Sequence, residues 1–520
     1  MNLRRNMLIP AAALVLLVSS CNYLDVSDQL AGGLQNTDEV FENVSYTKRW
    51  YASIFTGIPD YSGLNSTNVN GFKNPWASIC DELVTGYGNA SKYNNSDKNA
   101  TNVSFHRYGD CYKAIRQANI FLQKAHVITA GGTQGDELLE PELKRYQANA
   151  RFMRAFYHYL LFEQYGPIII VGDKVYEATE SQDMSRNSVD EVVEYLDKEL
   201  LASADELSQE PIIDENYRAE PTKGVALAVR AKMWVYAASP LLNGGFNEAL
   251  NIANPDGKKL FPIADAAKWE RARQACADFI NYANENNRYE LYYAAPEKNG
   301  VVNPEKSVYE LFQKYTKEII WATATADWGG LDGDAFDRRI VPRTEQNGLG
   351  STGVTQELVD AFYMNDGLPI RGTTYLPASP QYTEEGMSTY TETNVDPIKG
   401  GKEYTPVNVS NRFINREARF YNTVFFNGRQ WPVTCNTIQF YNGGNAGQQN
   451  GQYTQTGYML FKRFNRRISK TSPGVSSRYR PSIIFRLADF YLLYAEAANE
   501  VNPNDPVVLE YLNKVRHRAG

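Results

Sequence analysis

The stretch Glu142–Tyr165, which reads ELKRYQANARFMRAFYHYLLFEQY, carries the clearest structural pattern in the chain. Apolar residues recur along it at the three- to four-residue spacing of one face of an α-helix. Gly166-Pro167 follows directly, and glycine and proline at that place are typical of a helix end. The stretch therefore predicts a long amphipathic helix with one face turned to a core.

Two other stretches repeat this helical pattern. Gly224–Ser239 is rich in alanine, and such small side chains let a neighbouring helix approach closely. An apolar stripe from Ile484 to Ala498 is followed by a turn at Asn502–Pro506 and by a second helical stretch, Val507–Arg518. This helix–turn–helix has the size and composition of a tetratricopeptide hairpin, although strict repetition is absent. We therefore expect a mainly α-helical scaffold of tetratricopeptide-like helix pairs.

Long irregular segments interrupt the helical pattern. Residues 60–105 and 371–480 are rich in Asn, Ser, Gly and Tyr. Loops of this length are either functional or disordered, and their aromatic content argues against disorder. We expect a large, irregular, loop-rich lobe beside the helices. The expected organisation is a signal peptide at 1–20, a region of helices and ligand-binding loops at 21–370, the lobe at 371–480 and a helical hairpin at 481–520.

Composition narrows the class of protein. The 520 residues include 53 Lys and Arg against 60 Asp and Glu, which gives a net charge of −7. Nucleic-acid binding requires clustered basic residues, so nucleic acid is not an expected partner. Hydrophobic residues at 43% and charged residues at 22% exclude collagen-like, wholly disordered and polytopic membrane proteins. The 35 tyrosines outnumber the 23 phenylalanines. This excess favours partly exposed rings, each with a polar hydroxyl, on a surface that binds a polar ligand.

The first twenty residues resemble an export signal. Arg4 and Arg5 precede the apolar stretch Met7–Val18, which is too short to span a membrane. Small residues then lead to Cys21, as in a bacterial lipobox, where the cysteine is acylated and becomes the new N-terminus. We predict a lipoprotein that is anchored through Cys21 and does not span the membrane. The alternative is an ordinary signal peptide followed by a chance cysteine.

The remaining cysteines are too few for a disulfide scaffold. Cys80, Cys111, Cys276 and Cys435 are spread over the exported chain, and none belongs to a Cys-x-x-Cys pair. We expect buried free thiols, with Cys80–Cys111 as the pairing to check.

Motifs for cofactors, metals and nucleophiles are weak. Gly348–Gly353 matches G-x-G-x-x-G, but a loop rather than a strand precedes it, so we interpret it as a flexible loop ahead of a helix at Val354–Phe362. The four histidines lack metal-ligand spacing, and neither a G-x-S-x-G elbow nor a P-loop is present. No cofactor, no metal and no catalytic residue is therefore predicted. A glycosidase needs only two carboxylates at a set separation, which the sequence does not reveal.

An acidic cluster suggests calcium but lacks its usual spacing. Asp327, Asp332, Asp334 and Asp337 lie close together, without the EF-hand spacing or its final glutamate. We expect solvated loop carboxylates there and leave calcium binding open.

Loop-borne aromatic residues are the best binding signal. Trp76 follows Asn-Pro and Trp328 precedes Gly-Gly, whereas Trp234 and Trp269 fit helical patterns and are expected in the core. The face of a tryptophan ring attracts the C–H groups of a sugar ring, so flat stacking is expected. The alternative is that the two loop rings merely hold their loops in place.

Four further residues complete the predicted ligand site. Tyr87 and Tyr93 lie in polar, glycine- and asparagine-rich loops, and Asp81 and Asp332 are the candidate acceptors for sugar hydroxyls.

Several blocks together resemble the SusD/RagB family of outer-membrane nutrient-binding lipoproteins. They occur in the family's order along the chain. The blocks are Cys21–Asp25, Ala150–Tyr157 with Tyr165-Gly166-Pro167, Pro221–Ala226, Ile484–Asp489 with Leu493–Ala497, and Leu512–Gly520.

The resemblance implies a fold and a role. It implies a stack of tetratricopeptide-like helix pairs with a loop-rich lobe, held at the cell surface over a SusC-like TonB-dependent transporter. The implied function is capture of oligo- or polysaccharides for import, without catalysis. A peptide-binding, RagB-like receptor is the alternative, and a surface glycoside hydrolase or a plain scaffold is a weaker one. Family members usually continue past the "R.RAG" helix, so this chain is expected to lack its C-terminal end.

Overall fold

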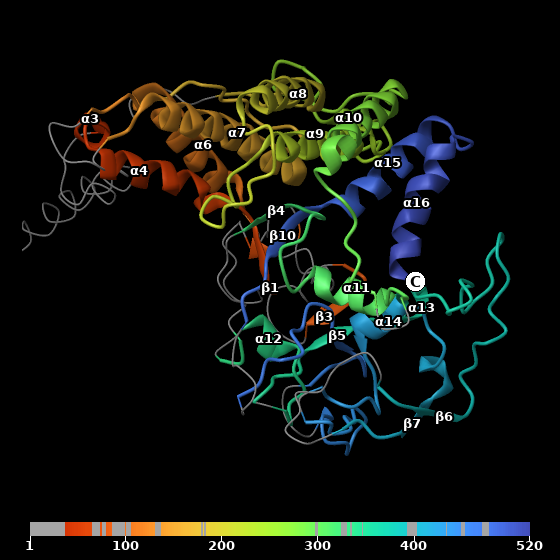
Figure 1. Cartoon of the computed structure of the whole chain (residues 1–520). Coiled ribbons are helices and arrows are strands. Elements are labelled where there is room, and N and C mark those ends of the chain that lie inside the picture. The colour runs from red at the N-terminus through yellow and green to blue at the C-terminus, as the bar shows by residue number, and fades with distance from the viewer. Residues whose placement is uncertain are drawn as a thin grey trace, which may run out of the picture.

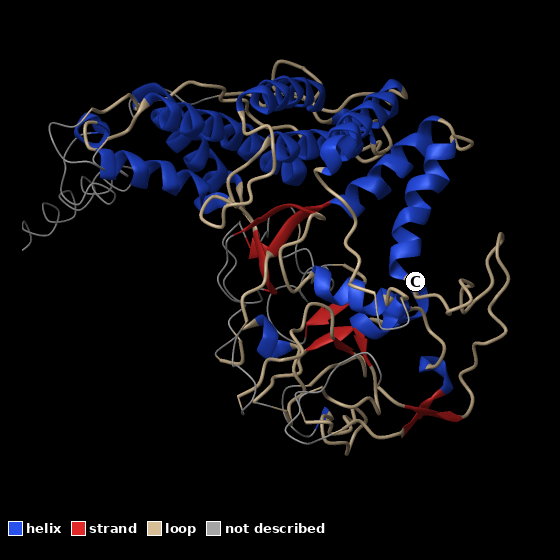
Figure 2. Ribbon diagram, in the orientation of Figure 1, coloured by secondary structure: helices blue, strands red, loops and turns tan. Residues whose placement is uncertain are grey.

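The computed structural model has two layers, a row of helices above a loop-rich lobe (Figure 1). Figure 2 shows that the strands are short and lie below the helical layer. This arrangement confirms the predicted mainly α-helical scaffold with an irregular lobe. The structure describes residues 37–64, 73–74, 80–85, 99, 106–129, 137–177, 180, 184–296, 300–323, 330–332, 335–345, 347–392, 403–432, 434–448, 453–470 and 478–520.

The upper layer is a row of helices in which each helix packs against the next along the row. The row runs through α10 and then passes directly to α15, which packs against α10 although most of the lobe lies between them in the sequence (Figure 1). The main hydrophobic core lies between these helices. The helices are α3 (Thr37–Phe41), α4 (Val44–Ser53), α6 (Tyr108–Lys124), α7 (Glu140–Tyr165), α8 (Val189–Glu206), α9 (Lys223–Ala238), α10 (Ala267–Asn284), α15 (Leu487–Val501) and α16 (Pro506–Ala519).

The predicted helix ends are confirmed at α7 and α9. Gly166 ends α7 with a φ of +67°, a conformation that glycine adopts without strain. In α9, a Cβ at Gly224 would lie 2.6 Å from the Tyr289 hydroxyl. The small residue therefore allows the segment after α10 to pack directly on α9.

The C-terminal hairpin differs from the prediction at its start. The apolar stripe was expected to be helical from Ile484, but Ser482–Arg486 forms strand β10, and α15 begins at Leu487. The physical reason is tertiary: β10 pairs antiparallel with β4 (Ile319–Thr323), and such long-range pairing overrides a local helical pattern. The following turn and α16 are as predicted, and Asp505 caps α16 by accepting from the Val507 N–H at 3.0 Å.

The lobe consists of small sheets and short helices. One sheet has the strand order β3-β5-β9-β8, and β1-β2, β4-β10 and β6-β7 are two-stranded. The elements are β1 (Asp60–Leu64), β2 (Lys73–Asn74), β3 (Leu83–Thr85), α11 (Pro304–Leu311), α12 (Phe336–Arg339), β5 (Thr352–Val354), α13 (Gln356–Ala361), β6 (Met387–Tyr390), β7 (Val407–Ser410), α14 (Ala418–Thr423), β8 (Val424–Phe425) and β9 (Met459–Leu460), with a short 3-10 turn at Asn411–Phe413. Three further 3-10 turns lie between the helices of the upper layer, at Ile54–Gly57, Ala249–Asn251 and Glu285–Asn287 (η5).

The lobe has its own aromatic core. Phe425, Phe461 and Phe464 pack around Trp431, and all four are buried. A third, smaller cluster contains Phe312 and lies at β4 and β10, where the chain passes between the two layers.

Buried ion pairs hold the irregular backbone of the lobe. Asp337 pairs with Arg480, and both side chains are fully buried. Arg429 pairs with Glu392 at 2.6 Å. The interpretation of Asp337 as a solvated loop carboxylate is therefore wrong. Its carboxylate is buried away from water, and its charge is balanced by the guanidinium of Arg480, which lies far away in the sequence.

The glycine-rich motif is also packed more tightly than expected. A Cβ at Gly348 would lie 2.3 Å from the Val341 carbonyl oxygen. The motif ends inside β5, which pairs with β3 and β9. The segment is therefore a close-packed turn rather than a flexible loop, and its helix is confined to α13 (Gln356–Ala361).

The cysteines and the two helix-borne tryptophans largely follow the sequence predictions. Cys111 and Cys276 are buried, Cys80 and Cys435 are partly exposed, and the described residues form no Cys80–Cys111 disulfide. Trp234 is buried, and Trp269 is half-buried against the same core. Within the described residues, no helix combines the length and apolar character that a membrane crossing requires.

Candidate functional site

Most of the predicted ligand residues lie outside the described part of the chain. These are Trp76, Tyr87, Tyr93, Trp328 and the anchor Cys21. Their roles stay predictions.

Asp81 and Asp332 are described, and both are exposed. The Asp81 carbonyl accepts a hydrogen bond from the Thr355 hydroxyl at 2.5 Å, which ties its turn to the start of α13. The Asp332 carboxylate lies 2.6 Å from Lys470 Nζ, so it forms a solvent-exposed ion pair with that lysine. Among the described residues, no group of three or more His, Cys, Asp or Glu gathers as a metal site.

The structure reveals a tyrosine-rich groove that the sequence analysis did not identify. It has a volume of about 690 Å³ and lies where the segment after α10 meets residues 314–317 and the α15–α16 pair. Aromatic rings and amines dominate its lining. The lining includes Tyr289, Tyr292, Tyr293, Tyr315, Tyr491, Lys314, Lys317, Lys514 and Glu290. We call this site the tyrosine groove.

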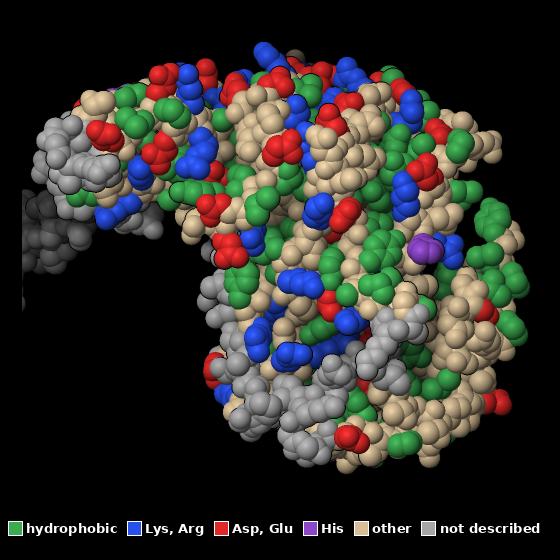
Figure 3. All heavy atoms as spheres, viewed as in Figure 1, with side chains coloured by type: hydrophobic (Ala, Val, Ile, Leu, Met, Phe, Trp, Pro, Cys, Tyr) green, Lys and Arg blue, Asp and Glu red, His purple; other side chains and the backbone are tan. Residues whose placement is uncertain are grey.

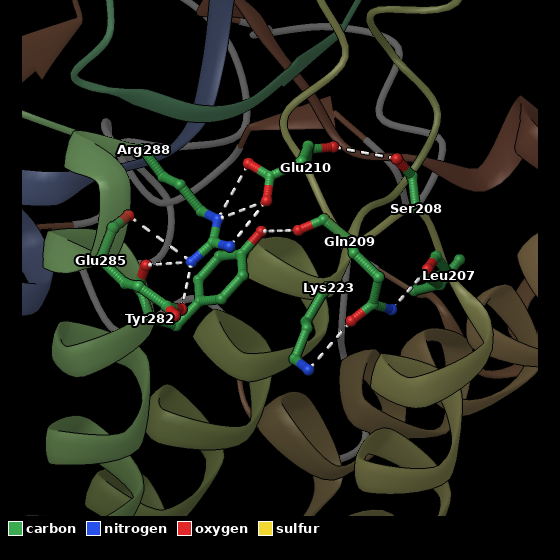
Figure 4. Close-up of polar contacts among 8 residues, drawn as sticks. All are labelled: Leu207, Ser208, Gln209, Glu210, Lys223, Tyr282, Glu285 and Arg288. Atoms are coloured by element: carbon green, nitrogen blue, oxygen red, sulfur yellow. Dashed lines mark hydrogen bonds and ion pairs between the residues drawn. The ribbon is translucent and has the colours of Figure 1, made fainter.

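A polar cluster at the end of α10 holds the first wall of the tyrosine groove (Figure 4). Arg288 lies 2.6 Å from Glu210 and 2.6 Å from Glu285, and its guanidinium stacks 4.5 Å from the centre of the Tyr282 ring. Its hydrogen bonds lower the pKa of Glu210. The Tyr282 hydroxyl donates to the Gln209 carbonyl at 2.7 Å. These bonds fix the chain immediately before the tyrosines at 289–293.

Within that wall, hydrogen bonds hold Tyr292 in place, whereas Tyr293 is exposed to solvent. The Tyr292 N–H donates to Glu318 at 2.8 Å, and its hydroxyl donates to Glu310. Burial and the bond to Glu310 raise the pKa of Tyr292. Lys314 pairs with Glu310 at 2.8 Å. Tyr293, at 42% exposure, presents its ring to solvent.

The opposite wall comes from the last two helices. Tyr491 on α15 is largely buried, and burial followed by the neighbouring Tyr511 raises its pKa to about 12. Lys514 on α16 lies 4.2 Å from the centre of the Tyr511 ring and pairs with Glu510 at 2.7 Å. This wall therefore offers a neutral ring beside a fixed ammonium group.

Tyr315 extends the tyrosine groove towards the end of β4. Its ring stacks on Tyr479, with centroids 6.4 Å apart and planes 22° apart, and Arg218 lies 4.3 Å from its centre. The Tyr315 hydroxyl donates to the carbonyl of Thr323 at 3.3 Å. Thr323 ends β4, a few residues before Trp328 in the sequence.

This arrangement suits non-covalent binding of a polyhydroxylated ligand. Ring faces stack on C–H groups, while phenol and ammonium groups at the edges exchange hydrogen bonds with hydroxyls. Of the described lining residues, Glu290 alone carries a carboxylate, whereas glycoside hydrolysis uses two. The sequence signal that points here is the cluster of tyrosines at 289–293. The overall excess of tyrosine agrees with it, but loop tryptophans were the stronger binding signal in the sequence.

Two family models match the sequence. One, described as the SusD family, matches residues 317–520. The other, described as starch-binding and associating with the outer membrane, matches residues 51–235. Together they account for well over half of the chain. Among curated proteins, none matches.

Solved structures share the fold. BT4246 superposes with a TM-score of 0.70 at 23% identity, over 92% of this chain and 82% of that one. A SusD-like carbohydrate-binding protein of Bacteroides fragilis gives 0.62 at 17% identity, over 92% and 79%. Surface glycan-binding protein A of Bacteroides uniformis gives 0.53 at 16% identity, over 92% and 80%. The resemblance stated from sequence blocks and the fold that it implied are thereby confirmed.

Proposed function

The chain belongs to the SusD family, and from this membership we propose that it binds oligo- or polysaccharides without cleaving them. We further propose that it delivers them to a SusC-like TonB-dependent transporter for nutrient uptake. It works at the outer-membrane surface, held there by a lipid on Cys21 after removal of residues 1–20.

The tyrosine groove is the observation that carries this proposal. It combines an exposed ring (Tyr293), a half-buried ring (Tyr315) and fixed amines on one open surface. Sugar rings bind such surfaces by stacking and by hydrogen bonds at their edges. The matched family description, starch-binding and outer-membrane-associating, supports the ligand class and the location. Two of the similar structures are of proteins described as carbohydrate-binding and glycan-binding, which supports the ligand class as well.

The charges around the tyrosine groove favour binding over hydrolysis. A general acid needs a carboxyl group whose pKa is raised towards neutrality. Burial alone raises the pKa of Glu310, but hydrogen bonds from Lys314 and Tyr292 bring it below its usual value. Glu318, which lies next to this wall, forms ion pairs with two arginines, Arg486 and Arg518.

The ligand proposal is tested by affinity-gel retention of the mature protein on a panel of polysaccharides, with released reducing sugar assayed in parallel. Tyr293→Ala is expected to lower affinity about tenfold for the retained polymer, because one stacking ring is lost. Tyr375→Ala is the matched control, since Tyr375 is 92% exposed and does not line the tyrosine groove. Its affinity is expected to equal that of the wild type.

Three results contradict the ligand proposal. Equal affinity in the wild type and Tyr293→Ala removes the tyrosine groove as the site. Sugar release indicates a hydrolase. Retention of peptides but of no polysaccharide indicates the RagB-like alternative. The delivery step has its own test, because the protein should copurify with a TonB-dependent transporter from detergent-solubilised outer membranes.

A further inference from the structure

Two asparagines line the tyrosine groove together with its tyrosines. Asn284 is the last residue of α10, and Asn287 ends the η5 turn that follows it. Both residues are exposed, and within the part of the chain that the structure describes neither side-chain amide makes a hydrogen bond. Figure 3 shows hydrophobic side chains, tyrosines among them, at the surface below the row of helices, where these elements lie. The tyrosine groove therefore combines aromatic rings with free amide groups.

Asparagines elsewhere in the chain use their amides to hold the backbone. Asn119, Asn243 and Asn422 are buried, and each donates to a backbone carbonyl at 2.8 to 3.0 Å. A buried amide has to find its hydrogen-bond partners inside the protein. Asn284 and Asn287 do no such work, so their amides remain available to a ligand in the groove.

The backbone at Asn287 has a conformation that few residue types accept. Asn286 and Asn287 have φ angles of +55° and +49°, and no other two consecutive non-glycine residues in the described part of the chain have positive φ. Glycine adopts this left-handed conformation without steric cost, and asparagine tolerates it better than most residues. A turn alone would favour glycine at both positions. Non-glycine residues held in this conformation are concentrated at binding sites, which points to a use for the side chain.

Contacts on both sides hold this turn in place. The Arg288 guanidinium lies between Glu285 and Glu210, 2.6 Å from a carboxylate oxygen of each (Figure 4). From the other wall, Lys317 Nζ donates to the Asn287 carbonyl at 3.5 Å. The backbone that carries the Asn287 amide is thus fixed before a ligand arrives, and such pre-organisation lowers the entropic cost of binding.

We propose that Asn287 is a specificity-determining residue of the tyrosine groove and that its amide binds two adjacent free hydroxyls of one sugar ring. The inference rests on the proposed function, because it takes the ligand of the groove to be a glycan. A carboxamide accepts hydrogen bonds at its oxygen and donates them from its nitrogen, so each end can engage one of two neighbouring hydroxyls. Tyr293, whose ring is exposed in the same groove, supplies the stacking face. The ligand class is a polysaccharide with unsubstituted ring hydroxyls at the bound unit.

The test is affinity gel electrophoresis of the mature protein with soluble starch, laminarin, arabinoxylan and mannan, each unmodified and O-acetylated. The variant Asn287→Gly removes the amide and keeps the positive φ. Asn286→Gly is the matched control, since Asn286 has the same backbone conformation but does not line the groove. We expect Asn287→Gly to bind the retained unmodified polymer about tenfold more weakly than the wild type, because the hydrogen bonds of one amide are lost. Asn286→Gly should bind it like the wild type.

Acetylation of the polymer provides a second measurement, which a purely structural role of Asn287 would not change. Because an acetyl group replaces a hydroxyl proton, the acetylated polymer should bind the wild type and Asn286→Gly more weakly than the unmodified polymer. In Asn287→Gly this loss on acetylation should be about tenfold smaller, since the amide that binds the hydroxyls is absent. Both variants should melt close to the wild-type temperature, because glycine accepts the backbone conformation of the turn.

The inference and the proposed function fail differently. Equal binding of an unmodified polymer by the wild type and Asn287→Gly overturns the role of Asn287 and leaves the glycan function standing. An equal loss of affinity in Asn287→Gly and Asn286→Gly also overturns it, because the backbone of the turn and not the amide is then responsible. An undiminished loss on acetylation in Asn287→Gly overturns the binding of hydroxyls by this amide. If the wild type is retained by no polymer of the panel, the glycan function and the inference fall together.

Discussion

Arg518 on the last helix places its Nη1 2.5 Å from Oε2 of Glu318, the buried residue that precedes β4. The same carboxylate receives Arg486 of β10 at 3.0 Å and the N–H of Tyr292 at 2.8 Å. One carboxylate thus joins α16, the strand pair between the layers and a wall of the tyrosine groove. Because Glu318 is fully buried, its two guanidinium partners replace the water that it has lost.

Glu318→Gln should therefore be strongly destabilising. It leaves two guanidinium groups without their carboxylate, for which the expected loss is about 3–5 kcal/mol in the free energy of unfolding. Urea denaturation measures it. Glu510→Gln is the matched control, since Glu510 pairs with Lys514 at the surface and should cost at most about 1 kcal/mol. Similar losses in the two variants would show that Glu318 does not join the layers.

His158 should make stability depend on pH in the acid range. It is fully buried in α7, and burial lowers its pKa from 6.5 to about 4. Between these pH values the imidazole of His158 is protonated in the unfolded chain but neutral in the folded chain. The free energy of unfolding therefore falls as the pH drops from about 6.5 to about 4. The expected loss is about 3 kcal/mol.

The measurement is urea denaturation at pH 6.5, 5.5 and 4.5 for the wild type, His158→Gln and the exposed-residue control His126→Gln. The pH slope should shrink in His158→Gln and persist in His126→Gln. An unchanged slope in His158→Gln assigns the acid sensitivity to carboxylates instead.

Trp328→Ala tests the predicted ligand loop. In the sequence, Trp328 lies beside Gly329-Gly330. Thr323, whose carbonyl accepts a hydrogen bond from the Tyr315 hydroxyl, comes five positions before Trp328. We expect glycan affinity to fall about tenfold, with the melting temperature nearly unchanged. A large loss of thermal stability with intact binding would mean that the ring holds its loop in place and contacts no ligand.

Cys21→Ala tests the proposed anchor. Acyl chains contribute about 0.8 kcal/mol for each buried CH₂, so their loss should release the protein from the membrane fraction. Cell fractionation in a strain without the partner transporter is the measurement, since the transporter itself could retain the protein. Cys80→Ala, which alters a partly exposed cysteine elsewhere in the same chain, should stay with the membrane. Persistent membrane association of the Cys21 variant would disprove the anchor.

The helices could be predicted because their information is local. The period of Glu142–Tyr165 and the stop at Gly166 lie within one stretch of sequence, and the structure places α7 within two residues of the prediction. The start of α15 could not be predicted in this way. Ile484 fits a helical stripe, but its strand is fixed by pairing with β4, which lies far away in the sequence.

The candidate site was less accessible to sequence reasoning for the same reason. Tyr293, Tyr315 and Tyr491 come from three separate segments, and only folding brings them to one groove. Asp337 fits an acidic loop, yet Arg480, 143 positions along the chain, makes it a buried structural ion.

The direct packing of α10 against α15 makes most of the lobe an insertion within a helical array. The two helices are roughly 200 residues apart, but loop-closure entropy rises only with the logarithm of length, so lengthening or shortening the lobe costs little stability. Folding rate responds differently, since contacts between distant segments form slowly. The helices up to α10 can assemble from local contacts, while α15 and α16 must wait for the whole lobe to be synthesised. The C-terminal pair is thus the late step of folding, and it completes the row of helices and the tyrosine groove in the same event.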